Sequence, residues 1–398
     1  MPAVSKLIAS LEPSATLAMA AKAKELTAAG KTVYDFSVGE PDFNTPQHIC
    51  DAAVEAMKKG HTKYTVASGI PELKAAVAKA YKATHGLDYT PAQVVISNGA
   101  KHSLHNAFTC LCNPGDEVII PAPYWVSYAE LVKLTGAKPV IVETEQANDF
   151  KLTPEALRKA CTPKTTILLL CSPSNPTGSM YSPADLAALA DVVIEKNLTV
   201  ISDEIYEQLV YGDNKFASFP TVRPGLQERT IVVNGVSKAY SMTGWRIGWT
   251  LAPANISKAM ADLQSQETSN PCSISQDAAL AAVTGPQECV QEMLAAFAKR
   301  RDYVKERIAG IPGLSAPDMG GAFYAFMNIK AFLGKTYGGV KVDTDTQWCL
   351  TLLEQHGVAT VMGSAFGAPG YARMSFATGM ETIQAGFDRI AAFIKSGT

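Results

Sequence analysis

Short apolar runs alternate with longer amphipathic segments through the middle of the chain. The runs are rich in valine, isoleucine and leucine and end in glycine, proline or polar residues, which is typical of strands buried on both faces. They predict strands at residues 93–97, 117–121, 165–171, 198–202, 230–234 and 247–251. Segments with apolar residues at helical spacing, such as 101–112, 125–135 and 182–195, lie between them. This alternation predicts an α/β fold with a mainly parallel sheet covered by helices on both faces.

The chain is long enough for two hydrophobic cores. Its 398 residues exceed what one core usually organises. The segments 254–266 and 286–308 have the pattern of long helices, and the second would cross from one domain to the other. We expect a large domain at residues 46–289 and a smaller α/β domain made of residues 290–398 together with the N-terminal arm, residues 1–45. The functional site would lie between the two.

Composition and charge disfavour several classes of function. The chain has 35 basic and 37 acidic residues and no basic stripe or polybasic tail, so we expect no nucleic-acid or membrane partner. No apolar stretch approaches the ~20 residues that span a bilayer, and charged residues interrupt the region where a signal peptide would need an apolar run. The eight cysteines lack metal-ligand spacing, and His102 and His105, three residues apart on one predicted helix, would need further ligands to form a metal site. We expect a cytoplasmic protein with reduced cysteines and no metal.

Three of the predicted strands are followed by polar residues that suit a common site, namely Asn175, Asp203 and Lys238. Taken singly, these residue types are usually a turn residue, a helix N-cap and a solvated charge. Because open α/β sheets bind ligands at the carboxyl ends of their strands, we expect the three side chains to meet there. A buried lysine amine can lose its proton and attack a carbonyl, and an aspartate can keep a pyridine nitrogen protonated. The set favours a site for pyridoxal phosphate.

The sequence also predicts an anion site. Asn98 and Gly99 form a tight turn between the strand at 93–97 and the helix at 101–112. Free amides and the positive end of the helix dipole attract anions at such a turn. Arg246 follows Lys238 by eight residues and adds a fixed positive charge.

Together these motifs resemble those of the class I/II aminotransferases of fold type I, which depend on pyridoxal phosphate. The sequence is most similar to the bacterial aspartate aminotransferase branch. The resemblance extends from residues 13–16 through 39–43 to 373–377, which is nearly the whole chain.

The resemblance implies a role for each residue of the cofactor site. Lys238 would link covalently to the cofactor and act with Asp203 and Tyr206 in catalysis, Asp203 pairing with the pyridine nitrogen. The other implied contacts are Asn175 and Tyr206 at the 3-oxygen of the ring, Trp125 stacked on the ring, and Ser237, Arg246 and the backbone at Gly99, Ala100 and Lys101 around the phosphate. Tyr64 resembles the tyrosine that reaches the phosphate of a neighbouring subunit, which implies a homodimer with a shared active site.

The resemblance further implies an amino-acid substrate. Arg373 would bind the α-carboxylate with support from Gly39, and Trp125 and Asn175 would also contact the substrate. A side-chain carboxylate would meet Lys101, with the hydroxyls of Ser14 and Thr16 nearby, because the chain has no arginine between residues 246 and 300. The implied reaction converts L-aspartate and 2-oxoglutarate into oxaloacetate and L-glutamate with ping-pong kinetics.

Several alternatives remain open on the sequence alone. Relatives that also transaminate prephenate usually carry a basic residue where this chain has Glu12, so prephenate and aromatic amino acids rank below aspartate. A C–S β-lyase could use the same cofactor residues. An effector module of a transcription regulator would need a DNA-binding segment before the fold, and we expect none. A non-catalytic binding module would not explain why Asn175, Asp203, Lys238, Arg246 and Arg373 occur together.

Overall fold

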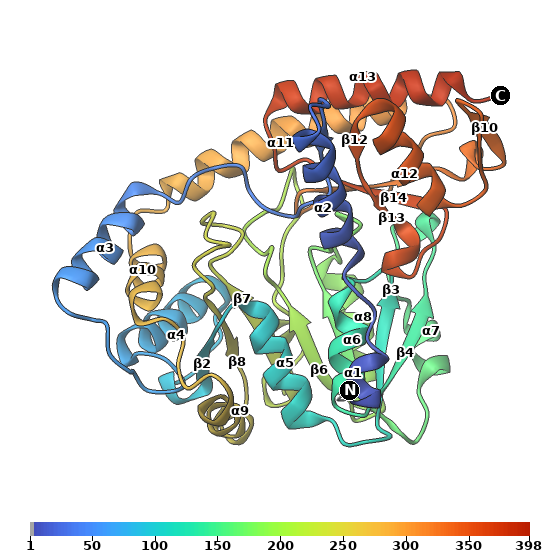
Figure 1. Ribbon diagram of the computed structural model, residues 1–398. Coiled ribbons are helices and arrows are strands. Elements are labelled where there is room, and N and C mark those ends of the chain that lie inside the picture. Colours follow the sequence, from blue (N-terminus) through green and yellow to red (C-terminus); the bar gives the residue numbers. More distant parts are fainter. Residues whose placement is uncertain (1–3) are drawn as a thin grey trace.

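The computed structural model describes residues 4–398 and is built around a seven-stranded sheet and a three-stranded sheet (Figure 1). The strands are β1 (Tyr34–Asp35), β2 (Val94–Ser97), β3 (Glu117–Ala122), β4 (Lys138–Glu143), β5 (Thr165–Cys171), β6 (Thr199–Asp203), β7 (Thr230–Gly235), β8 (Gly248–Leu251), β9 (Tyr324–Asn328), β10 (Lys335–Tyr337), β11 (Val340–Val342), β12 (Val358–Ala359), β13 (Val361–Met362) and β14 (Tyr371–Ser375). The helices are α1 (Lys6–Ala9), α2 (Ala15–Ala28), α3 (Gln47–Lys58), α4 (Pro71–His85), α5 (Ala100–Leu111), α6 (Ser127–Leu134), α7 (Pro154–Ala160), α8 (Pro183–Glu195), α9 (Ala254–Glu267), α10 (Ser273–Thr284), α11 (Glu288–Ala309), α12 (Asp345–His356) and α13 (Met380–Ser396).

The large sheet has the strand order β2-β8-β7-β6-β5-β3-β4. β7, β6, β5, β3 and β4 run parallel, whereas β8 is antiparallel to both of its neighbours. The sheet is therefore mainly parallel, as the sequence predicts, and each of the six predicted strands is present to within one residue at either end.

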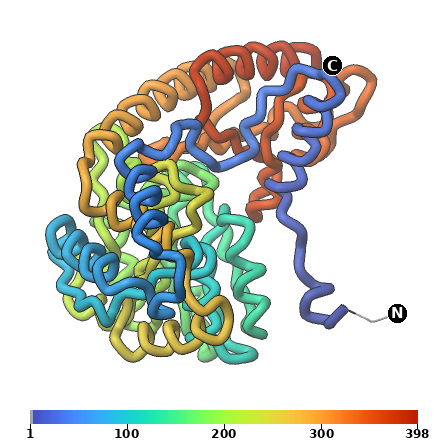
Figure 2. Tube along the Cα trace, turned by 60° about the vertical axis from the view of Figure 1, so that its left-hand side comes forward, coloured from blue at the N-terminus to red at the C-terminus, as the bar shows by residue number. Residues whose placement is uncertain are grey.

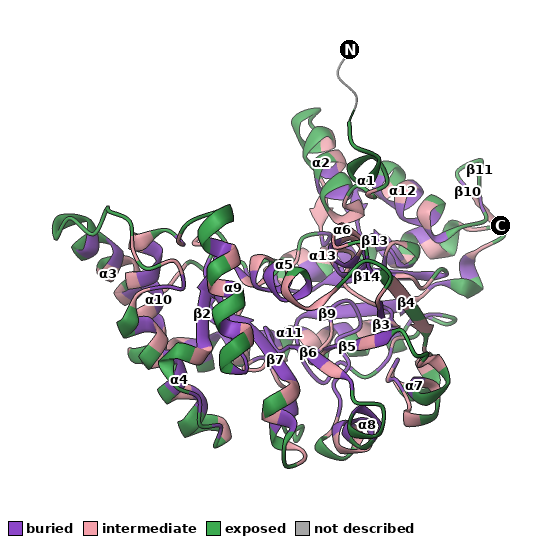
Figure 3. Cartoon of the chain, turned by 90° about the horizontal axis from the view of Figure 1, so that it is seen from below, coloured by how far each residue is buried: buried purple, intermediate pink, exposed green. Residues whose placement is uncertain are grey.

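Helices cover both faces of this sheet, and the side chains of β5 show why. Ile167 and Leu169 pack in a cluster with α5, α6 and α9, whereas Leu168 and Leu170 point the other way and pack with α7 and α8. Successive side chains of a strand alternate between faces, so a strand that is apolar throughout must be covered on both sides. Figure 3 shows the result, with buried strands between helices whose outer faces are exposed.

The register of the parallel strands brings the ends of three of them together. Cys171 at the end of β5 pairs with Asp203 at the end of β6, and Asp203 pairs with Val233 near the end of β7. The segments that follow these strands therefore start at one edge of the sheet, where α/β proteins bind ligands.

A second buried cluster joins the N-terminal arm to the C-terminal third of the chain. It packs the small sheet β13-β14-β9 against α11, α12 and α13, and β1 pairs with β12. In Figure 2 the blue N-terminal segment rises to α2, which lies beside the red C-terminal elements. The limits of the two domains stay a prediction. Within residues 4–398 the structure contains no helix that combines the length and apolarity needed to cross a membrane.

Candidate active site

A cavity of about 300 Å³ lies at the carboxyl ends of β5, β6 and β7. Its walls come from the large sheet, from α5 and α6, and from the N- and C-terminal segments. Most of the residues proposed from the sequence line it, namely Ser14, Thr16, Gly39, Ala100, Lys101, Trp125, Asn175, Asp203, Tyr206, Ser237, Lys238, Arg246 and Arg373.

Lys238 projects into this cavity from the turn after β7. Its amine donates a hydrogen bond to the Gly39 carbonyl at 2.7 Å. Burial lowers the pKa of the amine to about 8, with Glu40 opposing the shift and Arg246 and Arg373 adding to it. A lysine with that pKa has about one tenth of its amines neutral at pH 7, compared with well under a thousandth for an ordinary lysine. The residue can therefore act as a nucleophile.

Asp203 ends β6 and is almost fully buried. Its carboxylate accepts hydrogen bonds from the Tyr128 hydroxyl at 2.6 Å and from the Ile205 amide at 3.3 Å. Burial raises the pKa of this carboxyl to about 6, and the two hydrogen bonds and Lys238 oppose the increase. The buried carboxylate faces the same cavity as the lysine amine and suits a cationic partner there.

Tyr206 and Asn175 line the same cavity. The Tyr206 hydroxyl is hydrogen-bonded to the Tyr324 hydroxyl at 2.8 Å, and both side chains are buried. The amide of Asn175 accepts a hydrogen bond from Arg373 at 2.9 Å. Because that bond uses the amide oxygen, the NH₂ group of Asn175 is free to donate toward the cavity.

Arg373 is held rigidly in the middle of β14. Its guanidinium lies between the rings of Tyr324 and Phe366, 4.7 and 4.9 Å from their centres. It donates to Asn175 and to the Ser37 carbonyl, the latter at 2.5 Å. Its Nε atom is buried without a hydrogen-bond partner among residues 4–398. A fixed and partly unsatisfied guanidinium is suited to bind a carboxylate with two parallel hydrogen bonds.

The part of the cavity at the N-terminus of α5 is suited to an anion. Ala100 is the first residue of α5, so its amide has no acceptor within the helix. Gly99 has a φ of +83°, and a Cβ atom there would collide with the Arg246 guanidinium. Gly248 packs equally closely against Ala100. Only glycine fits either place, and the close packing aligns the helix N-terminus, Arg246 and Ser237 on one pocket.

Lys101 and Trp125 line the cavity near the N-terminal arm. The Lys101 amine lies 4.9 Å from the centre of the Trp125 ring, and burial and Arg246 lower its pKa. Thr16 has a buried hydroxyl with no hydrogen-bond partner in the described part of the chain, which is consistent with a ligand contact. Ser14 has a structural role as well, because its hydroxyl caps α2 by accepting from the Leu17 amide.

Tyr64 lies outside the cavity. Its side chain is 90% exposed in the loop between α3 and α4. No hydrogen bond from the described chain holds this side chain. Tyr64 could therefore contact a bound ligand only in the cavity of a second copy of the chain.

The sequence did not point to several residues that the structure places at the site. Tyr128 supports Asp203, Tyr324 supports Tyr206 and Arg373, and Leu17 and Thr243 line the cavity. These residues are hard to identify from the sequence, because none of them belongs to a recognisable catalytic or binding motif.

A family model for aminotransferases of class I and II matches residues 31–390. The chain belongs to this family. It is therefore a transferase enzyme, and the resemblance seen in its motifs is confirmed. Within the family it is 48% identical to an aspartate aminotransferase of Geobacillus stearothermophilus and 47% identical to an aspartate/prephenate aminotransferase of Cereibacter sphaeroides, with 99% of each chain covered in both cases.

Solved structures agree with this assignment. The aspartate aminotransferase of Rhizobium meliloti has a TM-score of 0.96 at 42% identity, with both chains covered completely. The aspartate aminotransferase of Thermus thermophilus with maleate has a TM-score of 0.92 at 40% identity, over 99% of this chain and 100% of that one. The fold is thus that of fold-type I aminotransferases, as expected.

Proposed function

We propose that this aminotransferase uses pyridoxal 5′-phosphate, bound through Lys238, to transfer the amino group of L-aspartate to 2-oxoglutarate. The observation that carries the proposal is the lysine amine with a pKa near 8, set in one cavity with a buried carboxylate and a buried arginine. The names of the similar proteins support aspartate as the donor.

The residues of the cavity fit this cofactor. An amine, a carboxylate and an anion pocket correspond to its aldehyde, ring nitrogen and phosphate, in that order. When bound, the cofactor supplies an electron-accepting ring that stabilises negative charge at the substrate Cα. Asn175 and Tyr206 would donate to the 3-oxygen of the ring, and Trp125 would stack on the ring face.

Each protein group has a distinct task in the reaction. Lys238, as a neutral amine, would hold the cofactor through its aldehyde, and during the reaction it would move a proton to and from the substrate Cα as a general acid and base. Asp203 would keep the ring nitrogen of the cofactor protonated, and Tyr128 holds the Asp203 carboxylate in place through the 2.6 Å hydrogen bond. Ser237, Arg246 and the amides at Gly99, Ala100 and Lys101 would neutralise the phosphate.

The substrate would be held at both of its ends. Arg373, with Gly39 beside it, binds the α-carboxylate and orients the Cα–H bond toward the Lys238 amine. Lys101 would attract the side-chain carboxylate, and the Thr16 hydroxyl, which has no partner among residues 4–398, would donate to it, with Ser14 nearby. Burial and Arg246 disfavour the charged form of Lys101 and lower its pKa, and a carboxylate beside the amine would offset this cost.

Prephenate is a second candidate substrate. The relative from Cereibacter sphaeroides carries the name aspartate/prephenate aminotransferase. In this chain Glu12 is exposed just before Pro13, and its amide donates to the Glu130 carboxylate at 3.0 Å, while Glu130 is ion-paired with Lys133 at 2.7 Å. The negative charge of Glu12 would repel the second carboxylate of prephenate, so aspartate is preferred.

The active site is proposed to be completed by a second copy of the chain. Tyr64 is the residue that would reach the phosphate of the partner, and its 90% exposure leaves it available for that contact. The division into a large domain at residues 46–289 and a small domain at residues 1–45 and 290–398 stays a prediction. The same holds for a cytoplasmic location.

Steady-state turnover with aspartate, phenylalanine and prephenate tests the substrate assignment. With 2-oxoglutarate as acceptor, aspartate should have a higher kcat/KM than phenylalanine, and the rates should fit a ping-pong scheme. Prephenate is itself a keto acid, so it is tested as the acceptor with aspartate as donor, where it should have a lower kcat/KM than 2-oxoglutarate. A tenfold or greater preference for phenylalanine over aspartate, or for prephenate over 2-oxoglutarate, would reject the assignment. Release of pyruvate and ammonia without any acceptor would instead point to a β-lyase.

A further inference from the structure

We infer that His102 is a positioning residue for the phosphate-binding turn, because its Nδ1 atom accepts the amide hydrogen of Asn98. This inference rests on the proposed function, since it presupposes a phosphate-bearing cofactor at the N-terminus of α5. It concerns a residue outside the cavity that acts on the cofactor through the backbone.

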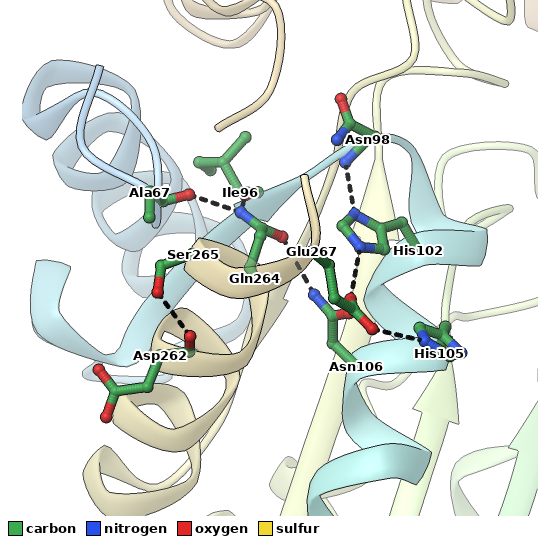
Figure 4. A network of polar contacts seen from close by, with 10 residues as sticks. All are labelled: Ala67, Ile96, Asn98, His102, His105, Asn106, Asp262, Gln264, Ser265 and Glu267. Atoms are coloured by element: carbon green, nitrogen blue, oxygen red, sulfur yellow. Dashed lines mark hydrogen bonds and ion pairs between the residues drawn. The ribbon is translucent and has the colours of Figure 1, made fainter. Parts of the chain in front are cut away.

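The contact ties the turn to the first turn of α5. The Asn98 amide nitrogen lies 3.3 Å from His102 Nδ1 (Figure 4). On the other side of the same peptide segment, the Asn98 carbonyl is 3.5 Å from Arg246 Nη2. Gly99 and Ala100 follow directly, so the amides that would bind the phosphate are held between His102 and Arg246.

Glu267 at the end of α9 sets the tautomer of His102. One carboxylate oxygen lies 3.3 Å from His102 Nε2, and the other lies 3.0 Å from His105 Nε2. A carboxylate only accepts hydrogen bonds, so His102 carries its hydrogen on Nε2. Nδ1 then keeps a lone pair and can accept from the Asn98 amide.

The position of Glu267 is itself fixed by a buried neighbour. Gln264 on α9 is fully buried and accepts from Asn106 of α5 at 3.0 Å. Its NH₂ group donates to the carbonyls of Ile96, at the start of the turn, and Ala67 (Figure 4). α9 is therefore attached to β2 and α5, and Glu267 presents its carboxylate to the histidine from a rigid support.

Protonation of His102 would break the contact. Protonation would place the second ring hydrogen on Nδ1, where it would point at the N–H group of Asn98, and two donors cannot bond to each other. Burial lowers the pKa of His102, His105 on the same helix adds to the decrease, and Glu267 of α9 opposes it. The neutral ring is therefore the form present near pH 7, and the turn loses its support only in acid.

The experiment is a titration of cofactor-free protein with pyridoxal phosphate, followed by absorption, for the wild type and three variants. His102→Leu removes the acceptor, and we expect its Kd to increase about tenfold, which corresponds to about 1.4 kcal/mol and to one hydrogen bond. His102→Asn places an amide oxygen where Nδ1 was, so its Kd should stay within about threefold of the wild type. His105→Leu is the matched control, since His105 shares Glu267 but has no contact with the turn, and its Kd should not change.

A pH series separates positioning from a general loss of stability. The phosphate titrates in both proteins, so the ratio of the wild-type Kd to the His102→Asn Kd isolates the histidine. We expect this ratio to increase as the pH falls below 6.5, because only the wild type loses its acceptor. The series decides the question even if His102→Leu does not fold.

Three results would overturn the inference: wild-type affinity in His102→Leu, an equal loss in His102→Asn or His105→Leu, or a ratio that is constant with pH. If the wild type itself binds no pyridoxal phosphate, the proposed function fails. If the wild type binds it and His102→Leu binds it equally well, the proposed function stands and only the inference about His102 fails.

Discussion

Replacement of Arg373 by lysine tests how the substrate is oriented. A guanidinium has five N–H donors. Here one donates to Asn175 and one to the Ser37 carbonyl, and the buried Nε has no partner in residues 4–398. Three N–H donors remain, and two of them can form parallel bonds to the α-carboxylate, each worth about 1.5–3 kcal/mol because it is charge-assisted. Lysine keeps the charge but replaces only one of them, so the expected loss is about 1.5–3 kcal/mol, or roughly 10- to 150-fold in kcat/KM.

The assay compares aspartate with β-alanine, which has the same amino group and distal carboxylate but lacks the α-carboxylate. Arg373→Lys should lower kcat/KM for aspartate by that factor and leave the low activity with β-alanine within about threefold. Lys101→Met is the matched variant for the other end of the substrate. It should lower kcat/KM for aspartate and leave alanine, which lacks the distal carboxylate, nearly unchanged.

A loss with β-alanine as large as that with aspartate would refute the reasoning, because Arg373 would then act on something other than the α-carboxylate. A loss with aspartate smaller than about threefold would also refute it. The absorption of the bound cofactor and the melting temperature of each variant show whether the protein is folded and loaded.

Three further predictions follow from the same site. Burial raises the pKa of Asp203 from 3.8 to about 6, so the folded cofactor-free protein loses stability as the pH increases from about 4 through 6. Asp203→Asn should therefore stabilise it by roughly 2–3 kcal/mol more at pH 7.5 than at pH 4 in urea unfolding, and a difference that does not vary with pH would contradict this. Gly99→Ala should weaken pyridoxal phosphate binding at least tenfold, because its Cβ atom meets Arg246. The control is Gly30→Ala, which has the same φ of +83° and open space around it, and it should cost about 1 kcal/mol of stability and leave binding unchanged. Equal Kd values for the two variants would argue against the tight fit at Gly99. Tyr64→Phe should weaken cofactor binding about fivefold in a protein that sediments as a dimer, and a monomeric wild type would exclude the shared site.

The sheet could be predicted from the sequence because its central strands are continuous apolar runs. β4 was not predicted. It lies at the edge of the sheet, where its residues are only half buried and Pro139 is tolerated, so its pattern is not that of a buried strand. The helix predicted from residue 125 begins at Ser127, which leaves Trp125 in the loop that faces the cavity.

The site could be predicted where residues follow strand ends, because the register of a parallel sheet brings such ends together. The supporting residues could not be predicted in this way. Tyr128 is 75 residues from Asp203 along the chain, and Tyr324 is 118 residues from Tyr206. Pairs so distant meet only through tertiary packing, which leaves no local pattern. The double role of Ser14, as helix cap and cavity residue, is likewise visible only in three dimensions.

Reduction of the loaded enzyme with borohydride, followed by peptide mapping, tests the covalent role of Lys238 most directly. Borohydride converts a carbon–nitrogen double bond between an amine and the cofactor aldehyde into a stable single bond. We predict that the pyridoxyl group is found on the peptide that contains Lys238 and on no other. A label on a different lysine, or a loaded protein that retains no label, would contradict the account.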